Sequence, residues 1–212
     1  MKLGIALIGV GLILSVEAAA FDAKDYAAAR RTVTEVETAM RRASADHARA
    51  EATYRQAVEK RRACNSLSWS RAYAPVMQDL ETQRQALESA RRLIGAYRAG
   101  LEQVRREIDA EDREIREHPE GVGERYWQAL EATTTQIRDG YVTKMNDAVL
   151  PAYRLYAEGI ELSAKVLEQY ATDCASPPGN EPARRAATEK VAPLLRDLTT
   201  RVDGIKKVIP SG

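Results

Sequence analysis

Hydrophobic residues recur at two fixed positions of a seven-residue repeat between Tyr73 and Ile115. This is the a/d pattern of a long helix that packs lengthwise against other helices. At about 1.5 Å per residue, such a helix would be roughly 65 Å long, which predicts an elongated molecule. The first position holds Tyr73, Leu80, Leu87, Ile94, Leu101, Ile108 and Ile115, and the second holds Val76, Ala90, Tyr97 and Val104.

Three more segments carry a helical pattern, and cap and turn residues mark their boundaries. Asp22 suits the N-cap of the first helix, whose seam is rich in alanine. Pro75 suits the first turn of the second helix, where its missing N–H costs nothing. Pro151 lies inside the third helix and predicts a kink or a short break there, because proline removes a backbone hydrogen bond. The four helices are expected at about 22–62, 73–117, 124–173 and 183–208.

The predicted fold class is all-α, because no segment alternates hydrophobic and polar residues as a β-strand does. Short connections make successive helices antiparallel neighbours. We therefore expect an elongated antiparallel four-helix bundle with coiled-coil-like seams, built from three long helices and one shorter C-terminal helix. Residues 21–212 would form this single domain. Opposite charges four residues apart, such as Arg98 and Glu102, are typical of a solvated outer face.

The N-terminus has the pattern of a secretory signal peptide. Lys2 precedes an apolar run at residues 3–16, and a small-residue site predicts cleavage between Ala20 and Phe21. The alternative is an uncleaved anchor, but the run is shorter than the ~20 apolar residues of a membrane-spanning helix. The pattern therefore predicts a periplasmic or secreted protein without stable membrane insertion after cleavage of residues 1–20.

The only two cysteines are Cys64 and Cys174. In an exported chain they suggest one disulfide, although the sequence alone also allows two free thiols or an intermolecular bond. The predicted topology decides between these alternatives. The first helix ends near Cys64 and the third near Cys174, so both would lie at the same end of the rod. We expect a structural disulfide rather than a redox-active pair, because there is no C-x-x-C motif.

Composition and motifs indicate little chemistry. The formal net charge is +1, with charged residues at 30%, which gives no electrostatic argument for nucleic acid or an anionic membrane surface. Motifs for haem attachment, zinc proteolysis, nucleophilic hydrolysis and phosphate binding are absent. His47 is expected within a helical seam, hydrogen-bonded to a tyrosine or carboxylate, and His118 at a helix C-terminus, too far apart to share a metal. We predict no catalytic residue, metal or cofactor.

Trp69 is the side chain that stands out as a candidate contact. It follows a polar, serine-rich stretch beside the expected disulfide, so it either packs over the end of the bundle or is offered to a partner. With Asn65, Ser68 and Ser70 it forms the candidate partner-contact site.

Export, the absence of catalytic motifs and a bundle with polar faces favour a non-enzymatic protein that binds another envelope or secreted protein. A chaperone, adaptor, inhibitor or immunity protein would fit this description, and a homo-oligomer is also compatible with it. One alternative is a membrane-tethered coiled coil of the envelope-spanning or lysis type, with residues 3–16 kept as an anchor. Another is a cofactor-binding or enzymatic helical bundle.

Overall fold

The computed structural model describes residues 23–117 and 124–210. The predicted signal peptide, its cleavage site at Ala20 and Phe21, and His118 lie outside the described residues. Within them every regular element is helical, which confirms the all-α class. None of the described helices is both long and apolar enough to cross a membrane.

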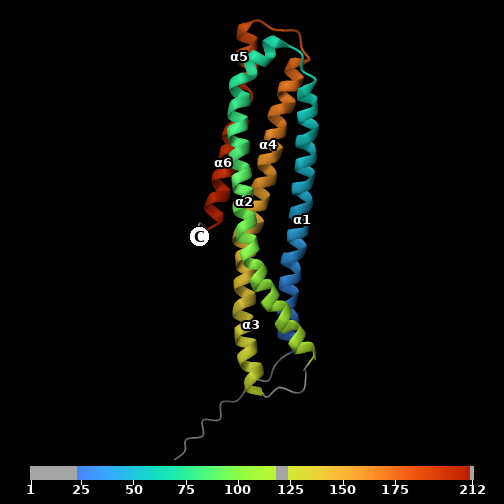
Figure 1. The fold of residues 1–212 in the computed structure, drawn as a ribbon, viewed down its shortest axis with the longest axis vertical. Helices are drawn as coiled ribbons and strands as arrows, with labels where there is room; N and C mark the ends of the chain where they lie inside the picture. Colours follow the sequence, from blue (N-terminus) through green and yellow to red (C-terminus); the bar gives the residue numbers. More distant parts are fainter. Residues whose placement is uncertain (1–22, 118–123, 211–212) are drawn as a thin grey trace, which may run out of the picture.

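The helices run lengthwise along one another and form an elongated bundle (Figure 1). It has three long helical segments, of which the third comprises α3, η1 and α4, and a shorter C-terminal helix. This arrangement confirms the predicted fold class. The helix α4 is central, because α1, α2 and α6 all pack along it. The elements are α1 (Ala23–Arg62), α2 (Leu67–Glu117), α3 (Glu124–Lys144), the π-helical turn η1 (Met145–Val149), α4 (Leu150–Cys174), α5 (Glu181–Glu189) and α6 (Ala192–Val208).

The predicted seam of α2 forms the spine of the hydrophobic core. Each of its described first-position side chains is at most 5% exposed, and burying one leucine or isoleucine contributes about 1.5–3 kcal/mol. The core has two parts, and Tyr97 and Tyr153 pack against both of them. The buried seam residues are Tyr73, Leu80, Leu87, Ile94, Leu101 and Ile108.

The second helix begins at Leu67, earlier than the predicted start near residue 73. Ser66 explains the difference, because its carbonyl oxygen accepts the Ser70 N–H at 2.9 Å and its hydroxyl lies 3.5 Å from the Trp69 N–H. A serine at this position satisfies backbone donors of the first turn. Pro75 therefore lies inside α2 rather than in its first turn.

Two prolines mark the other departures from regular α-helix. The third long segment changes to the π-helical turn Met145–Val149 directly before Pro151, where the Leu150 N–H donates to the Met145 carbonyl oxygen. The last segment, predicted as one helix over 183–208, is instead divided into α5 and α6. Pro193 lies in the first turn of α6 and has no N–H to continue the preceding helix, which accounts for the division.

Candidate functional site

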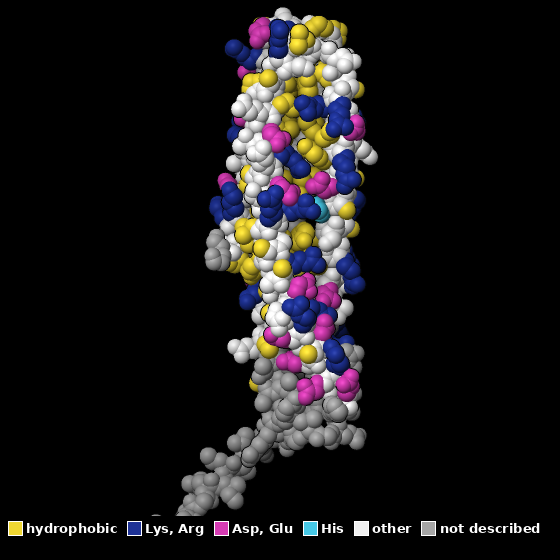
Figure 2. Space-filling view, in the orientation of Figure 1, with side chains coloured by type: hydrophobic (Ala, Val, Ile, Leu, Met, Phe, Trp, Pro, Cys, Tyr) yellow, Lys and Arg dark blue, Asp and Glu magenta, His cyan; other side chains and the backbone are white. Residues whose placement is uncertain are grey.

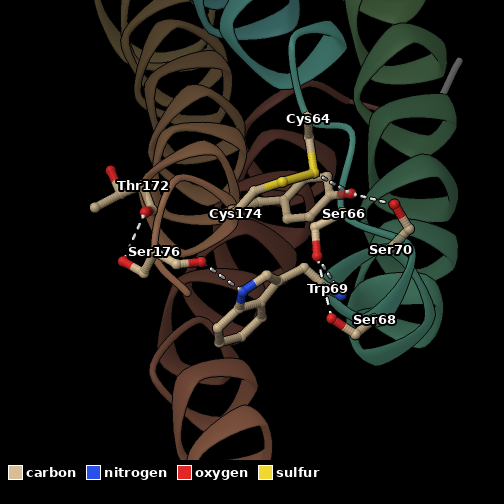
Figure 3. Close-up of a disulfide and its surroundings, with 9 residues drawn as sticks. Cys64, Ser66, Ser68, Trp69, Ser70, Thr172, Cys174 and Ser176 are labelled. Carbon is tan, nitrogen blue, oxygen red and sulfur yellow. Dashed lines mark hydrogen bonds between the residues drawn. A yellow bond between two sulfur atoms is a disulfide. The ribbon is translucent and has the colours of Figure 1, made fainter. Parts of the chain in front are cut away.

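The two cysteines meet at one end of the rod, as the topology predicts (Figure 3). Their Cα atoms are 5.7 Å apart, with the sulfurs bonded across a sequence separation of 110. The Tyr170 hydroxyl lies 3.2 Å from Cys64 Sγ. In the chain-entropy account, closing so long a loop stabilises the fold by about 4–5 kcal/mol. The disulfide thus fastens the C-terminal end of α1 to that of α4.

Trp69 packs over this end of the bundle, which is the first of the two alternatives for it. Its side chain is 4% exposed, and its indole Nε1 donates to the Ser176 carbonyl oxygen at 3.4 Å (Figure 3). A buried indole with its N–H satisfied is a structural residue, not an accessible contact. Leu67, by contrast, is 65% exposed and is the one large hydrophobic side chain exposed among the described residues.

Two other members of the predicted contact site, Ser68 and Ser70, are held by hydrogen bonds. The Ser70 hydroxyl lies 2.9 Å from the Tyr170 hydroxyl, and Ser68 Oγ lies 3.1 Å from Ser66 Oγ. Asn65 is exposed. Ser68 and Ser70 thus brace the end of the bundle. Asn65 lines an open hollow of about 790 Å³ beside the disulfide, of which Trp69 is not a lining residue.

A buried tyrosine strengthens the same end. The Tyr73 hydroxyl donates to Asp173 Oδ2 at 2.5 Å, and its ring is stacked on that of Tyr170 with centroids 4.7 Å apart. Burial, and then the Asp173 carboxylate, raise the pKa of Tyr73 well above its usual range. Tyr73 and Tyr170 are therefore structural residues that hold the ends of α2 and α4 together.

The surface between α1 and α2 is the more open part of the molecule. We use "α1–α2 face" for the surface on which residues 30–58 of α1 and residues 77–112 of α2 turn toward each other. Within the described chain these two helices are not among the closely packed pairs, and α4 lies behind the space between them (Figure 1). Figure 2 shows hydrophobic side chains recessed in the half of this face nearer the disulfide, above the histidine and a belt of charged side chains.

Two rows of residues cross this face from opposite directions, and each advances by seven residues. Seven residues keep a side chain on the same face of a packed helix, so the rows form the rungs of a ladder between antiparallel helices. The outer rungs are ion pairs: Arg30 Nε lies 3.2 Å from Asp112 Oδ2, and Arg105 binds Glu37. Continuing both rows at the same spacing from these two ion pairs gives the rungs Arg30–Asp112, Glu37–Arg105, Ser44–Arg98, Glu51–Arg91 and Val58–Arg84.

The central rung carries a polar cluster with His47. The Tyr156 hydroxyl of α4 donates to Glu51 Oε1 at 3.2 Å, and His47 Nε2 lies 3.8 Å from the same oxygen. The imidazole meets the Tyr156 ring edge to face at 4.9 Å, so His47 lies beside a tyrosine and a carboxylate. Its covered Nε2 atom has no hydrogen-bond partner among the described residues, so the expected hydrogen bond is not formed through this nitrogen. Burial, and then Glu51, raise the pKa of Tyr156 to about 12. Glu88, then Tyr156, and more weakly Glu51 raise the pKa of Arg91.

A cavity of about 330 Å³ opens at the rung where Ser44 faces Arg98. Its size is at the lower end of the range for small-molecule pockets. Arg98 Nη1 donates to the Tyr153 hydroxyl at 3.3 Å, and Arg98 Nε is 3.9 Å from Glu102. Arg98 thus lines a cavity, which its predicted place on a solvated outer face did not indicate. The apolar part of the cavity wall consists of Met40, Leu101, Tyr141 and Met145.

Arg84 occupies the rung opposite Val58. Its guanidinium carbon lies 4.2 Å from the centre of the Tyr54 ring, a cation–π contact that bridges α2 to α1. Its Nη1 atom is covered and has no hydrogen-bond acceptor within the described residues. A covered guanidinium N–H without an acceptor is costly, since it has lost water and gained nothing in exchange.

Among the side chains that the structure describes, no cluster of histidine, cysteine, aspartate or glutamate could hold a metal ion. No known protein family matches the chain, and neither a curated protein nor a solved structure matches it. The geometry of the α1–α2 face is therefore the basis for a functional proposal.

Proposed function

We propose that the protein is an exported, non-enzymatic helical protein of the cell envelope that binds another envelope or secreted protein through the α1–α2 face. The observation that carries the proposal is the combination on this face of recessed hydrophobic side chains with half-buried arginines and tyrosines (Figure 2). Arginine and tyrosine are enriched at protein interfaces, where a polar end remains satisfied as an apolar body is covered.

Export is supported by the signal-like N-terminus and by a cysteine pair placed for a disulfide, a bond that persists in oxidising compartments. Intact mass of the protein recovered from its host tests this part. Loss of residues 1–20 is the expected result. Retention of those residues would favour the membrane-tethered alternative instead.

Binding is tested by capture from envelope extract, with the partner identified by mass spectrometry. Tyr54→Ala removes an aromatic side chain from the α1–α2 face, and Leu195→Ala removes a half-buried apolar side chain from α6 as the matched control. We expect Tyr54→Ala to lose a protein that the unchanged chain and Leu195→Ala both retain, with the helical circular-dichroism signal unchanged in all three. Equal capture by all three proteins would contradict this location of the binding face.

A further inference from the structure

The charge ladder is incomplete at two of its five rungs. Where α1 supplies a charge that matches α2, the rung closes, as Arg30 does with Asp112 and Glu37 does with Arg105. At two other rungs α1 supplies Ser44 or Val58 instead, opposite Arg98 and Arg84.

At both incomplete rungs the structure has a feature that a carboxylate could fill: open space at one and, in the described chain, an unpaired guanidinium N–H at the other. Opposite Ser44 there is the cavity of about 330 Å³, and among the described residues the polar partners of Arg98 are a tyrosine hydroxyl and, at 3.9 Å, a carboxylate of its own helix. Opposite Val58, the covered Nη1 atom of Arg84 has no acceptor in the described part of the chain. Within the described residues no carboxylate of α1 forms an ion pair with either arginine; Glu37 lines the same cavity as Arg98 but is paired with Arg105. Arginine and carboxylate can form two parallel, charge-assisted hydrogen bonds, so an acidic side chain is the natural partner for both.

We propose that the partner docks an amphipathic helix along the α1–α2 face and that two of its carboxylates, two heptads apart, pair with Arg84 and Arg98. This inference rests on the proposed function and names the chemistry of its partner. The two arginines are fourteen residues apart, or about 21 Å along a helix, and fourteen residues also return to the same side of a partner helix. The apolar residues of that helix would cover the recessed hydrophobic side chains in Figure 2.

The rung between them sets a further condition on the partner. Arg91 already has Glu88 and Glu51 beside it, so this rung has no unmatched positive charge. A third carboxylate of the partner, midway between the other two, would meet Glu51 and be repelled. The favoured partner helix therefore carries acidic residues fourteen apart and none at the position halfway between them.

Three synthetic helical peptides with one common apolar face serve as probes. One has two glutamates fourteen residues apart, the second has glutamines at those positions, and the third has two glutamates seven apart. Fluorescence anisotropy measures their binding to protein purified after expression of the complete chain. The first peptide should bind about tenfold tighter than either of the others, and its advantage should shrink at high salt. Equal affinity for all three would overturn the proposal.

Variants of the protein locate the contacts. Arg84→Gln and Arg98→Gln should each remove most of the preference for the first peptide. Arg92→Gln, on a side chain that is 80% exposed, is the matched control and should keep it. Ser44→Glu supplies the missing carboxylate from α1, so it should raise the melting temperature and weaken peptide binding about tenfold. A Ser44→Glu protein with neither change would refute the assignment of this rung.

Two outcomes separate this inference from the proposed function. Capture of a natural partner that Tyr54→Ala loses, but that the Arg84→Gln/Arg98→Gln double variant retains, would leave the binding face in place and refute the two-carboxylate chemistry. Light scattering of the protein alone tests whether a second copy fills the face. A dimer that Ser44→Glu dissociates would replace the partner helix with another copy of this chain and overturn the inference.

Discussion

Raising the pH from 10 to 12 should remove and then reverse the stability difference between this protein and its Tyr156→Phe variant, because phenylalanine has no proton to lose at this position. Tyr156 is 2% exposed, and its hydroxyl donates to Glu51 Oε1. At neutral pH, loss of this hydrogen bond should make the variant less stable by about 1–2 kcal/mol. Burial, and then Glu51, raise the pKa of Tyr156 from 10.0 to about 12, while Arg84 and Arg91 act in the opposite direction.

The direction of the stability change follows from where the phenol of Tyr156 loses its proton in the folded and in the unfolded chain. Below pH 10 both the folded and the unfolded chain hold its proton, so the full stability is present. Between pH 10 and 12 the unfolded chain loses the proton and the folded chain keeps it, so stability falls as the pH rises. Each unit of pKa difference corresponds to about 1.4 kcal/mol, which gives a loss of about 2–3 kcal/mol specific to Tyr156.

Urea unfolding followed by circular dichroism, at closely spaced pH values, measures both proteins in parallel. Titration of arginine and lysine side chains affects both curves alike and cancels in their difference. That difference should be nearly constant up to about pH 10 and cross zero between pH 10 and 12, because the loss of about 2–3 kcal/mol exceeds the initial advantage of about 1–2 kcal/mol. Glu51→Gln should reduce the alkaline loss, because it removes the charge that helps to raise the pKa. Two curves that stay parallel through pH 12 would refute the reasoning.

Three further predictions concern the packing of the bundle. Reducing the disulfide should lower the free energy of unfolding by about 4–5 kcal/mol, measured in urea with and without reductant; a loss below 1 kcal/mol would contradict its role as a fastening. Trp69→Ala should cost about 3–5 kcal/mol, whereas Leu67→Ala, on an exposed side chain, should stay within about 0.5 kcal/mol. Gly100→Ala should stabilise the protein by about 1 kcal/mol, because a Cβ there meets open space. Gly159→Ala should fall short of that gain or destabilise, since its Cβ would lie 3.1 Å from Leu87 Cδ1, and equal melting temperatures for both variants would contradict this contact.

The long helices could be predicted from the sequence because a heptad pattern is a local property of each segment. Tyr73 and Ile108 lie in one seam whatever packs against it, and both are buried. The meeting of Cys64 and Cys174 followed from helix lengths and antiparallel order alone. The division of the last helix at Pro193 was harder to place, because a proline near a helix start is compatible with either a first turn or a break.

The burial of Trp69 could not be predicted from its neighbours in the chain. Its serine-rich surroundings are those of a loop, but the same serines also cap the first turn of α2, and the acceptor for its indole N–H is contributed by Ser176 far along the sequence. Burial of a side chain at the end of a bundle depends on which distant segment passes over it. Sequence reasoning therefore left two alternatives, and only the packing separates them.

The ladder shows the same distinction between local pattern and register. The seven-residue spacing of four arginines, Arg84, Arg91, Arg98 and Arg105, is visible in the sequence, but each also has acidic neighbours on its own helix or nearby, which is typical of a solvated face. Whether an arginine is matched across the bundle depends on which α1 residue the antiparallel register sets opposite it. Glu37 closes one rung and Ser44 leaves another open, and that difference belongs to the pair of helices rather than to either one. Within the described chain, α1 and α2 pack mainly on other helices and not on each other. The polar residues of the rungs are therefore freer than the core seam to carry a binding site.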